Sequence, residues 1–179
     1  MSDQMFVSNP NSQECPAKGY LERPPEGLTV NGYRNWAAGF MTKTDRHWEQ
    51  CRQKFISILG KHDGLLAANA MGNFVRSLGY CATCPLKCYA PGSGHLNADE
   101  CMILGLIASI QHGDEEALQE SVNALSCRSK CAQIISPAGE YAMIMKSAGS
   151  LLLPIPAPVL AEIYLNSKFQ DQKSNHTIH

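Results

Sequence analysis

Four of the eight cysteines in this chain have a spacing that is typical of metal ligands. They follow the pattern C-x2-C-x3-C-x12-C and are Cys81, Cys84, Cys88 and Cys101. A C-x2-C turn brings two sulfurs to one centre, and four thiolates satisfy either a tetrahedral zinc ion or a four-iron cluster. We therefore predict a metal centre at these four cysteines, with an iron–sulfur cluster or zinc as the cofactor.

The spacing leaves the choice of cofactor open, although it slightly favours iron–sulfur. Zinc sites often use the C-x2-C pair twice, whereas a cluster accepts one pair, a third nearby cysteine and a distant fourth. The alternative is that some of these cysteines are small buried hydrophobic residues. We favour a metal because the irregular segment 79–96 is long for a connection within a compact domain and needs a reason to be ordered. His95 is a substitute ligand if Cys81 or Cys88 is not used.

Two features favour the thiolate form that metals bind. Cys101 falls in the first turn of a predicted helix, where the helix dipole stabilises negative charge. Lys87 adds a positive charge next to Cys88 in the sequence.

A second pair, Cys127 and Cys131, is interleaved with basic residues in the sequence SCRSKC. A spacing of four on a helix places both sulfurs on one side, and neighbouring cations lower the pKa of a thiol. We predict that this pair is a redox couple or supplies additional metal ligands. His47 and Cys51 have the same spacing, but Cys51 continues an apolar stripe and is predicted to be a core residue.

Charge and composition narrow the class of protein. With 15 basic and 16 acidic residues the net charge is -1, which argues against strong nucleic-acid binding. Charged residues make up 17%, against roughly 25% in a typical soluble domain, so we expect a surface covered by a protein partner or a second copy. The N-terminus lacks the apolar run of a secretory signal, and prolines interrupt the most apolar stretch, 150–165. We expect a cytoplasmic protein with no membrane segment.

The apolar periodicity predicts an all-α protein, a single compact domain of about six or seven helices. The helical pattern begins at Asn31, and Asn97 with Glu100 predicts a capping box before the most apolar helix. Pro137 is predicted to open a later helix. We divide the chain into a flexible arm (1–28), a helical domain (29–168) with a Cys-rich loop (79–96), and a flexible tail (169–179).

These observations favour a metal- or redox-responsive regulatory protein that acts through a protein partner. The alternatives are a redox enzyme or electron carrier that uses the same cysteines, and an interaction domain with a purely structural zinc site. No phosphate-binding loop, nucleophile elbow or zinc-protease helix is present in the sequence, which leans against an enzyme.

Overall fold

The structure is a computed structural model that describes residues 16–81, 86–126 and 131–175, with side chains for 17–80, 86–126 and 132–169. The described residues form helices and no strands, which confirms the all-α prediction. There are eight helices in this part of the chain, rather than six or seven. They are α1 (Pro16–Leu21), α2 (Pro24–Thr42), α3 (Asp45–Leu59), α4 (Lys61–Cys81), α5 (Ala98–His112), α6 (Glu115–Leu125), α7 (Cys131–Ser147) and α8 (Ala157–Asn175).

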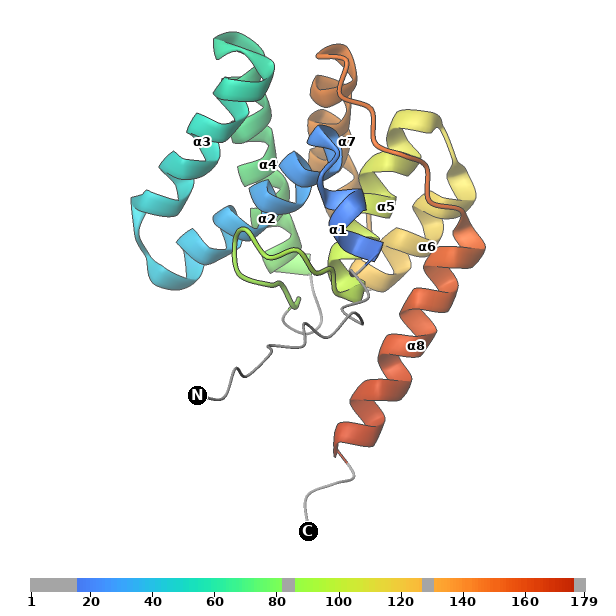
Figure 1. The fold of residues 1–179 in the computed structure, drawn as a ribbon. Helices are drawn as coiled ribbons and strands as arrows, with labels where there is room; N and C mark the ends of the chain where they lie inside the picture. Colours follow the sequence, from blue (N-terminus) through green and yellow to red (C-terminus); the bar gives the residue numbers. More distant parts are fainter. Residues whose placement is uncertain (1–15, 82–85, 127–130, 176–179) are drawn as a thin grey trace, which may run out of the picture.

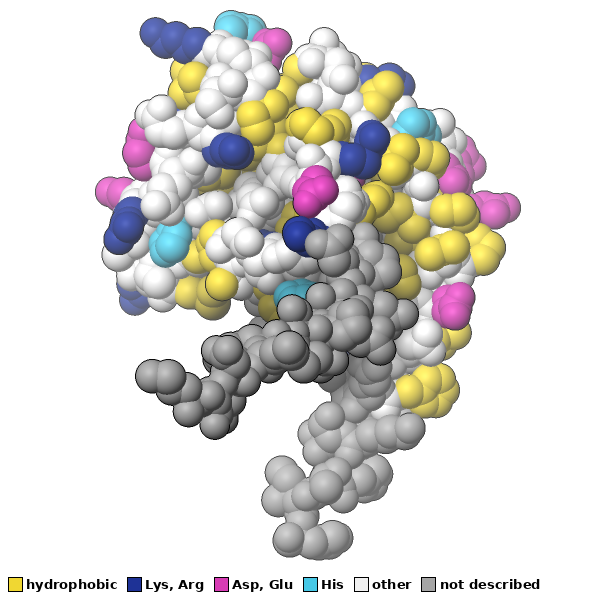
Figure 2. Space-filling model, viewed as in Figure 1, with side chains coloured by type: hydrophobic (Ala, Val, Ile, Leu, Met, Phe, Trp, Pro, Cys, Tyr) yellow, Lys and Arg dark blue, Asp and Glu magenta, His cyan; other side chains and the backbone are white. Residues whose placement is uncertain are grey.

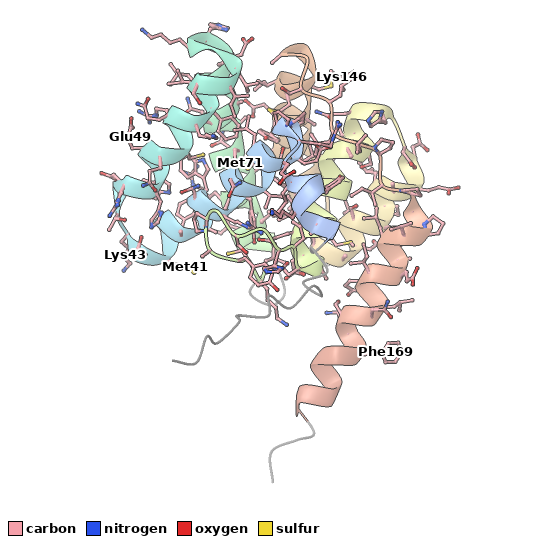
Figure 3. All side chains as sticks on the ribbon, in the orientation of Figure 1. Met41, Lys43, Glu49, Met71, Lys146 and Phe169 are labelled. Atoms are coloured by element: carbon pink, nitrogen blue, oxygen red, sulfur yellow. The ribbon has the colours of Figure 1, made fainter. Side chains whose placement is uncertain are left out.

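The helices form two groups that pack on each other through α4 and α7 (Figure 1). Helices α2, α3 and α4 follow one another in one group, and α5, α6 and α7 in the other. Helix α8 packs against α5 and α6, and its C-terminal part projects from the body. In Figure 3, Met71 of α4 lies inside the body, where it is fully buried, whereas Phe169 points away from it.

Three contacts fix the directions of the central helices. Phe55, near the end of α3, packs edge-on against Tyr141 in the second half of α7, with ring centroids 6.2 Å apart. At the end of α5, Gln111 donates a hydrogen bond to the Ala142 carbonyl and accepts one from Lys146. Helices α5 and α7 therefore end where α4 begins, and the end of α4 and the starts of α5 and α7 lie together at the opposite end of the bundle (Figure 1).

Helix α5 is apolar around most of its circumference because it is the central helix of its group. Its N-terminus has the predicted capping box, in which Asn97 accepts from the Glu100 N–H and Glu100 accepts from the Asn97 N–H. Gly113 ends the helix in the left-handed conformation, with φ of 72°. The local signals that cap a helix were thus sufficient to predict its bounds.

Two helices begin earlier than the sequence predicts. Helix α2 starts at Pro24, a residue suited to a first helical turn, so the predicted boundary at residue 28 falls inside a helix. The prediction that Pro137 opens a helix is wrong, because α7 starts at Cys131 and contains Pro137. Burial of Ile134, which is 0% exposed, stabilises the turn that precedes the proline.

None of the described helices combines the length and apolar character needed to cross a bilayer.

Candidate metal centre

A buried ion pair joins α2 to the first turn of α5, beside the segment that was expected to hold the metal. The Arg34 Nε donates to Glu100 Oε1 at 2.7 Å, and Nη2 donates to Oε2 at 3.0 Å. Both side chains are 0% exposed. This bidentate geometry is the strongest arrangement that an arginine and a carboxylate can form.

Arg34 also holds the backbone of the segment 86–97. Its Nη1 donates to the Ser93 carbonyl at 2.7 Å, and its Nη2 donates to the His95 carbonyl at 2.5 Å. One helical turn before Arg34, Asn31 accepts a hydrogen bond from the Gly92 N–H at 3.0 Å. Helix α2 therefore fixes the middle of this segment through side chains.

Glu100 holds both ends of the same segment. Its Oε1 accepts from the Tyr89 N–H at 3.0 Å, and its Oε2 accepts from the Asn97 N–H at 3.1 Å. The neighbouring Asp99 accepts from the Lys87 N–H at 2.7 Å. The argument that this segment needs a metal in order to be ordered is therefore wrong for residues 86–97, because protein groups hold it.

We call the Arg34–Glu100 pair, with its hydrogen bonds to the segment 86–97, the clamp. The sequence analysis did not predict it. It identified Glu100 only as a helix cap, and it assigned no structural role to Arg34. The available signal was a single cation in the sequence between the aromatic residues Tyr33 and Trp36, because a charge that is buried among apolar side chains needs a partner.

The predicted ligands come from the end of α4, the segment after it and the start of α5. Cys81 is the last residue of α4, and Cys101 lies in the first turns of α5. Cys88 lies in the clamped segment, and it and Cys101 are half-buried free thiols. Cys84 lies outside the described residues, and residues 79–81 of the predicted Cys-rich loop belong to α4, so Cys88 is the one cysteine in the described irregular part of that loop, 86–96. The structure thus brings Cys81, Cys88 and Cys101 to one end of the bundle.

The electrostatic surroundings of the two described thiols oppose the thiolate. Burial, with a smaller contribution from the Glu100 carboxylate, raises the pKa of Cys101 to about 11. The same two causes raise the pKa of Cys88, although Arg34 partly offsets them. Burial and the Glu100 carboxylate therefore outweigh any stabilisation of the Cys101 thiolate by the dipole of α5. A bound cation would have to supply that stabilisation itself.

The other candidates fall in different places. Cys131 is the first residue of α7, and Cys127 lies outside the described residues, so the two do not share a described helix. Cys51 is 1% exposed and lies 4.0 Å from the Gly32 carbonyl oxygen, which confirms that it is a core residue. His95 is exposed, with its ring 6.0 Å from that of Tyr89.

Among the described side chains, no three from histidine, cysteine, aspartate and glutamate are grouped so that they could hold a metal ion. The side chains of Cys81, Cys84, Cys127 and Cys131 are not among those described, so this finding leaves the predicted ligand set open.

A groove of about 440 Å³ lies between the clamped segment, the start of α5 and helix α8. Lys87 and Tyr89, the two neighbours of Cys88, line one side, and Ile163, Tyr164 and other residues of α8 line the other. Any displacement of Cys88 would therefore change the wall of this groove.

Comparisons with protein-family models, with curated proteins and with solved structures found no match for this chain.

Proposed function

We propose that this chain is a metal- or redox-responsive regulatory protein that acts through a protein contact. A thiolate-ligated iron–sulfur or zinc centre would be held by Cys81, Cys84, Cys88 and Cys101. The observation that carries the proposal is the convergence of Cys81, Cys88 and Cys101 at one end of the bundle, from a helix end, a clamped segment and a helix start.

The same geometry supports a route from the metal centre to the surface. Lys87 and Tyr89 flank Cys88 in the sequence, and both of them, together with Leu86, line the groove against α8. Gain or loss of a bond at the Cys88 sulfur would shift these residues, while Arg34 continues to hold the middle of the segment. The regulatory signal would therefore be a local change in the groove wall rather than release of the whole segment.

The experiment begins with protein purified anaerobically, whose metal content and visible spectrum are measured. A brown protein with iron and sulfide supports a cluster, and a colourless one with stoichiometric zinc supports a zinc site. Cys84→Ser and Cys101→Ser should each lose the metal. The matched control Cys51→Ala removes a core thiol and should keep it. If wild-type protein holds neither metal, the proposal is wrong.

Hydrogen exchange of the metal-loaded and chelator-treated protein tests the regulatory part. We expect faster exchange of the Lys87 and Tyr89 amides after metal removal, with the Asn97 amide unchanged. Global unfolding on metal removal would instead support the alternative of a purely structural zinc site. Reversible reduction of the centre with no change in exchange would support the alternative of an electron carrier.

A further inference from the structure

The groove of about 440 Å³ between the clamped segment and α8 has a helix as one of its walls. The side chains of α8 that line it include Ile163 and Ser167, and beside them Tyr164 and Lys168. The members of each pair are four residues apart and therefore lie one above the other on the helix surface. Rows of side chains at this spacing are the ridges against which a second helix packs. The wall therefore has a shape that suits a helical partner.

This wall continues into the part of α8 that leaves the body of the molecule. Leu160, near the start of α8, is fully buried, whereas the C-terminal part of the helix projects from the body (Figure 1). The residues that line the groove, 163–168, lie between these two parts. Because a helical stretch without neighbours gains little stability in water, a partner packed in the groove would also support the projecting part.

The groove offers apolar surface and room for close approach. Leu86 and Leu96 from the clamped segment face Ile163 of α8 across it, and the remaining lining includes the small residues Ala98 and Ala124. Burial of apolar surface favours binding of an apolar stripe, and small side chains allow the axes of two packed helices to come closer.

The charged residues of the groove favour an acidic partner. Lys87 lines one wall and Lys168 the other, and both residues are exposed. The lining also contains Asp99, but its carboxylate accepts the Lys87 N–H at 2.7 Å. Carboxylates of a partner would therefore meet a cation on each wall. A second copy is disfavoured here, because a two-fold contact would place the lysines of one copy against those of the other.

We propose that the groove binds an amphipathic helix of a protein partner, with apolar residues against Leu86, Leu96 and Ile163 and acidic residues next to Lys87 and Lys168. The inference rests on the proposed function, in which a protein contact at this groove carries the signal, and it names the chemistry of that partner. Binding of the helix itself requires no metal, so the two proposals can fail separately.

The probe is a peptide selected on the full-length chain from a displayed library of helix-forming sequences. We expect selected peptides to combine an apolar stripe with glutamate or aspartate on either side of it. Fluorescence anisotropy with one labelled peptide then measures affinity. Lys168→Glu should weaken binding at least about tenfold, and replacing the acidic residues of the peptide with lysine should restore it. The control Lys54→Glu makes the same charge change at an exposed residue of α3 and should have no effect.

Blocking the groove gives a second measurement that does not depend on charge. Ser167→Trp places a large side chain in the groove and should abolish peptide binding. The matched control is Leu165→Trp, at a residue of α8 that is 55% exposed and does not line the groove, and it should bind the peptide as the wild type does. Circular dichroism spectra should be the same for both variants.

The inference is wrong if no peptide is selected, if the selected peptides lack acidic residues, or if they bind Lys168→Glu and Ser167→Trp as tightly as the wild type. Binding of decanoate, or self-association, that only Ser167→Trp abolishes would assign the groove to a small carboxylate or to a second copy instead, and would also overturn it. Equal affinity of the peptide for metal-loaded and chelator-treated protein would leave the inference standing and show that the regulatory part of the proposed function is wrong.

Discussion

Arg34 and Glu100 form an ion pair in which the guanidinium nitrogens and both carboxylate oxygens all have hydrogen-bond partners. Besides each other, they bond the backbone at Tyr89, Ser93, His95 and Asn97. Charges removed from water are costly unless they are both paired and hydrogen-bonded. The pair therefore stabilises the segment 86–97 only as long as both members are present.

Replacing Arg34 with methionine tests this account. The variant Arg34→Met leaves the Glu100 carboxylate buried without its cation, and the free energy of unfolding should fall by about 3–5 kcal/mol. Urea denaturation measures the loss. The matched control is Arg52→Met, since the exposed Arg52–Glu49 pair, 3.6 Å apart, is expected to contribute no more than about 1 kcal/mol. Equal effects of the two substitutions would contradict the clamp.

Cys51 allows a prediction about pH. Burial raises the pKa of its thiol to about 12 from an ordinary value of 9.0, although Trp36 and Arg52 partly offset this. The folded protein thus keeps a proton that the unfolded chain releases near pH 9, so the stability due to the buried thiol is present below about pH 9 and is lost as the pH rises towards 12.

The comparison with Cys51→Ala isolates that effect. Near neutral pH the variant should be less stable than the wild type by about 1 kcal/mol, because a small cavity replaces the sulfur. At about pH 10 the wild type should lose about 1.4 kcal/mol relative to the variant. Unfolding free energies at the two pH values measure this. A constant difference between the two proteins would contradict the raised pKa.

At the scale of elements, local signals predicted helices whose ends carry their own caps. Asn97 caps α5 where the sequence predicted a capping box, and Gly113 and Asp114 then end α5 and cap α6 through equally local geometry. The starts of α2 and α7 were missed because they depend on burial against distant residues. Glu26 is one such case, because its buried carboxylate accepts from the Leu153 N–H across the fold.

Close approach of α3 and α4 depends on Gly64, and this supports a prediction with an internal control. A Cβ atom at Gly64 would lie 2.6 Å from the Ile56 backbone, which cannot move aside as a side chain would. Gly64→Ala should therefore destabilise the fold by about 1–3 kcal/mol. At Gly139, in α7, a Cβ atom meets nothing within 4 Å, so Gly139→Ala should add about 0.5–1 kcal/mol of helix propensity. Thermal melting curves should show a lower melting temperature for Gly64→Ala and a higher one for Gly139→Ala than for the wild type.

At the scale of the whole molecule, the candidate site could be predicted only in part. Cysteine spacing identified Cys88 and Cys101, which are close in sequence. It did not reveal Arg34, which is 66 residues from Glu100, nor that Cys131 lies at the same end as Cys81. Both facts depend on how helices pack, and no local pattern carries that information.

The molecule also presents a fixed apolar surface between α7 and α8. Figure 2 shows hydrophobic side chains gathered over the segment that joins α7 to α8 and over the start of α8. Leu151, Leu153 and Val159 are each exposed by more than two fifths. The segment is held in place, because Gln111 accepts from the Leu152 N–H and donates to the Ser150 carbonyl. Large apolar side chains held rigidly in solvent are typical of an interaction surface.

We expect that a second copy of this chain covers this surface. Residues 148–161 contain no ionisable side chain, so a two-fold contact brings no like charges together, whereas a charged partner surface would lose hydration without gaining a counter-charge.

Light scattering coupled to size-exclusion chromatography should give a dimer mass for the wild type. Leu151→Asp places two carboxylates across the two-fold contact and should give a monomer. The control Met41→Asp changes a side chain that is 71% exposed outside this surface and should leave the dimer intact. A wild type that is monomeric at all concentrations, or a Leu151→Asp dimer, would show that a second copy does not bind here.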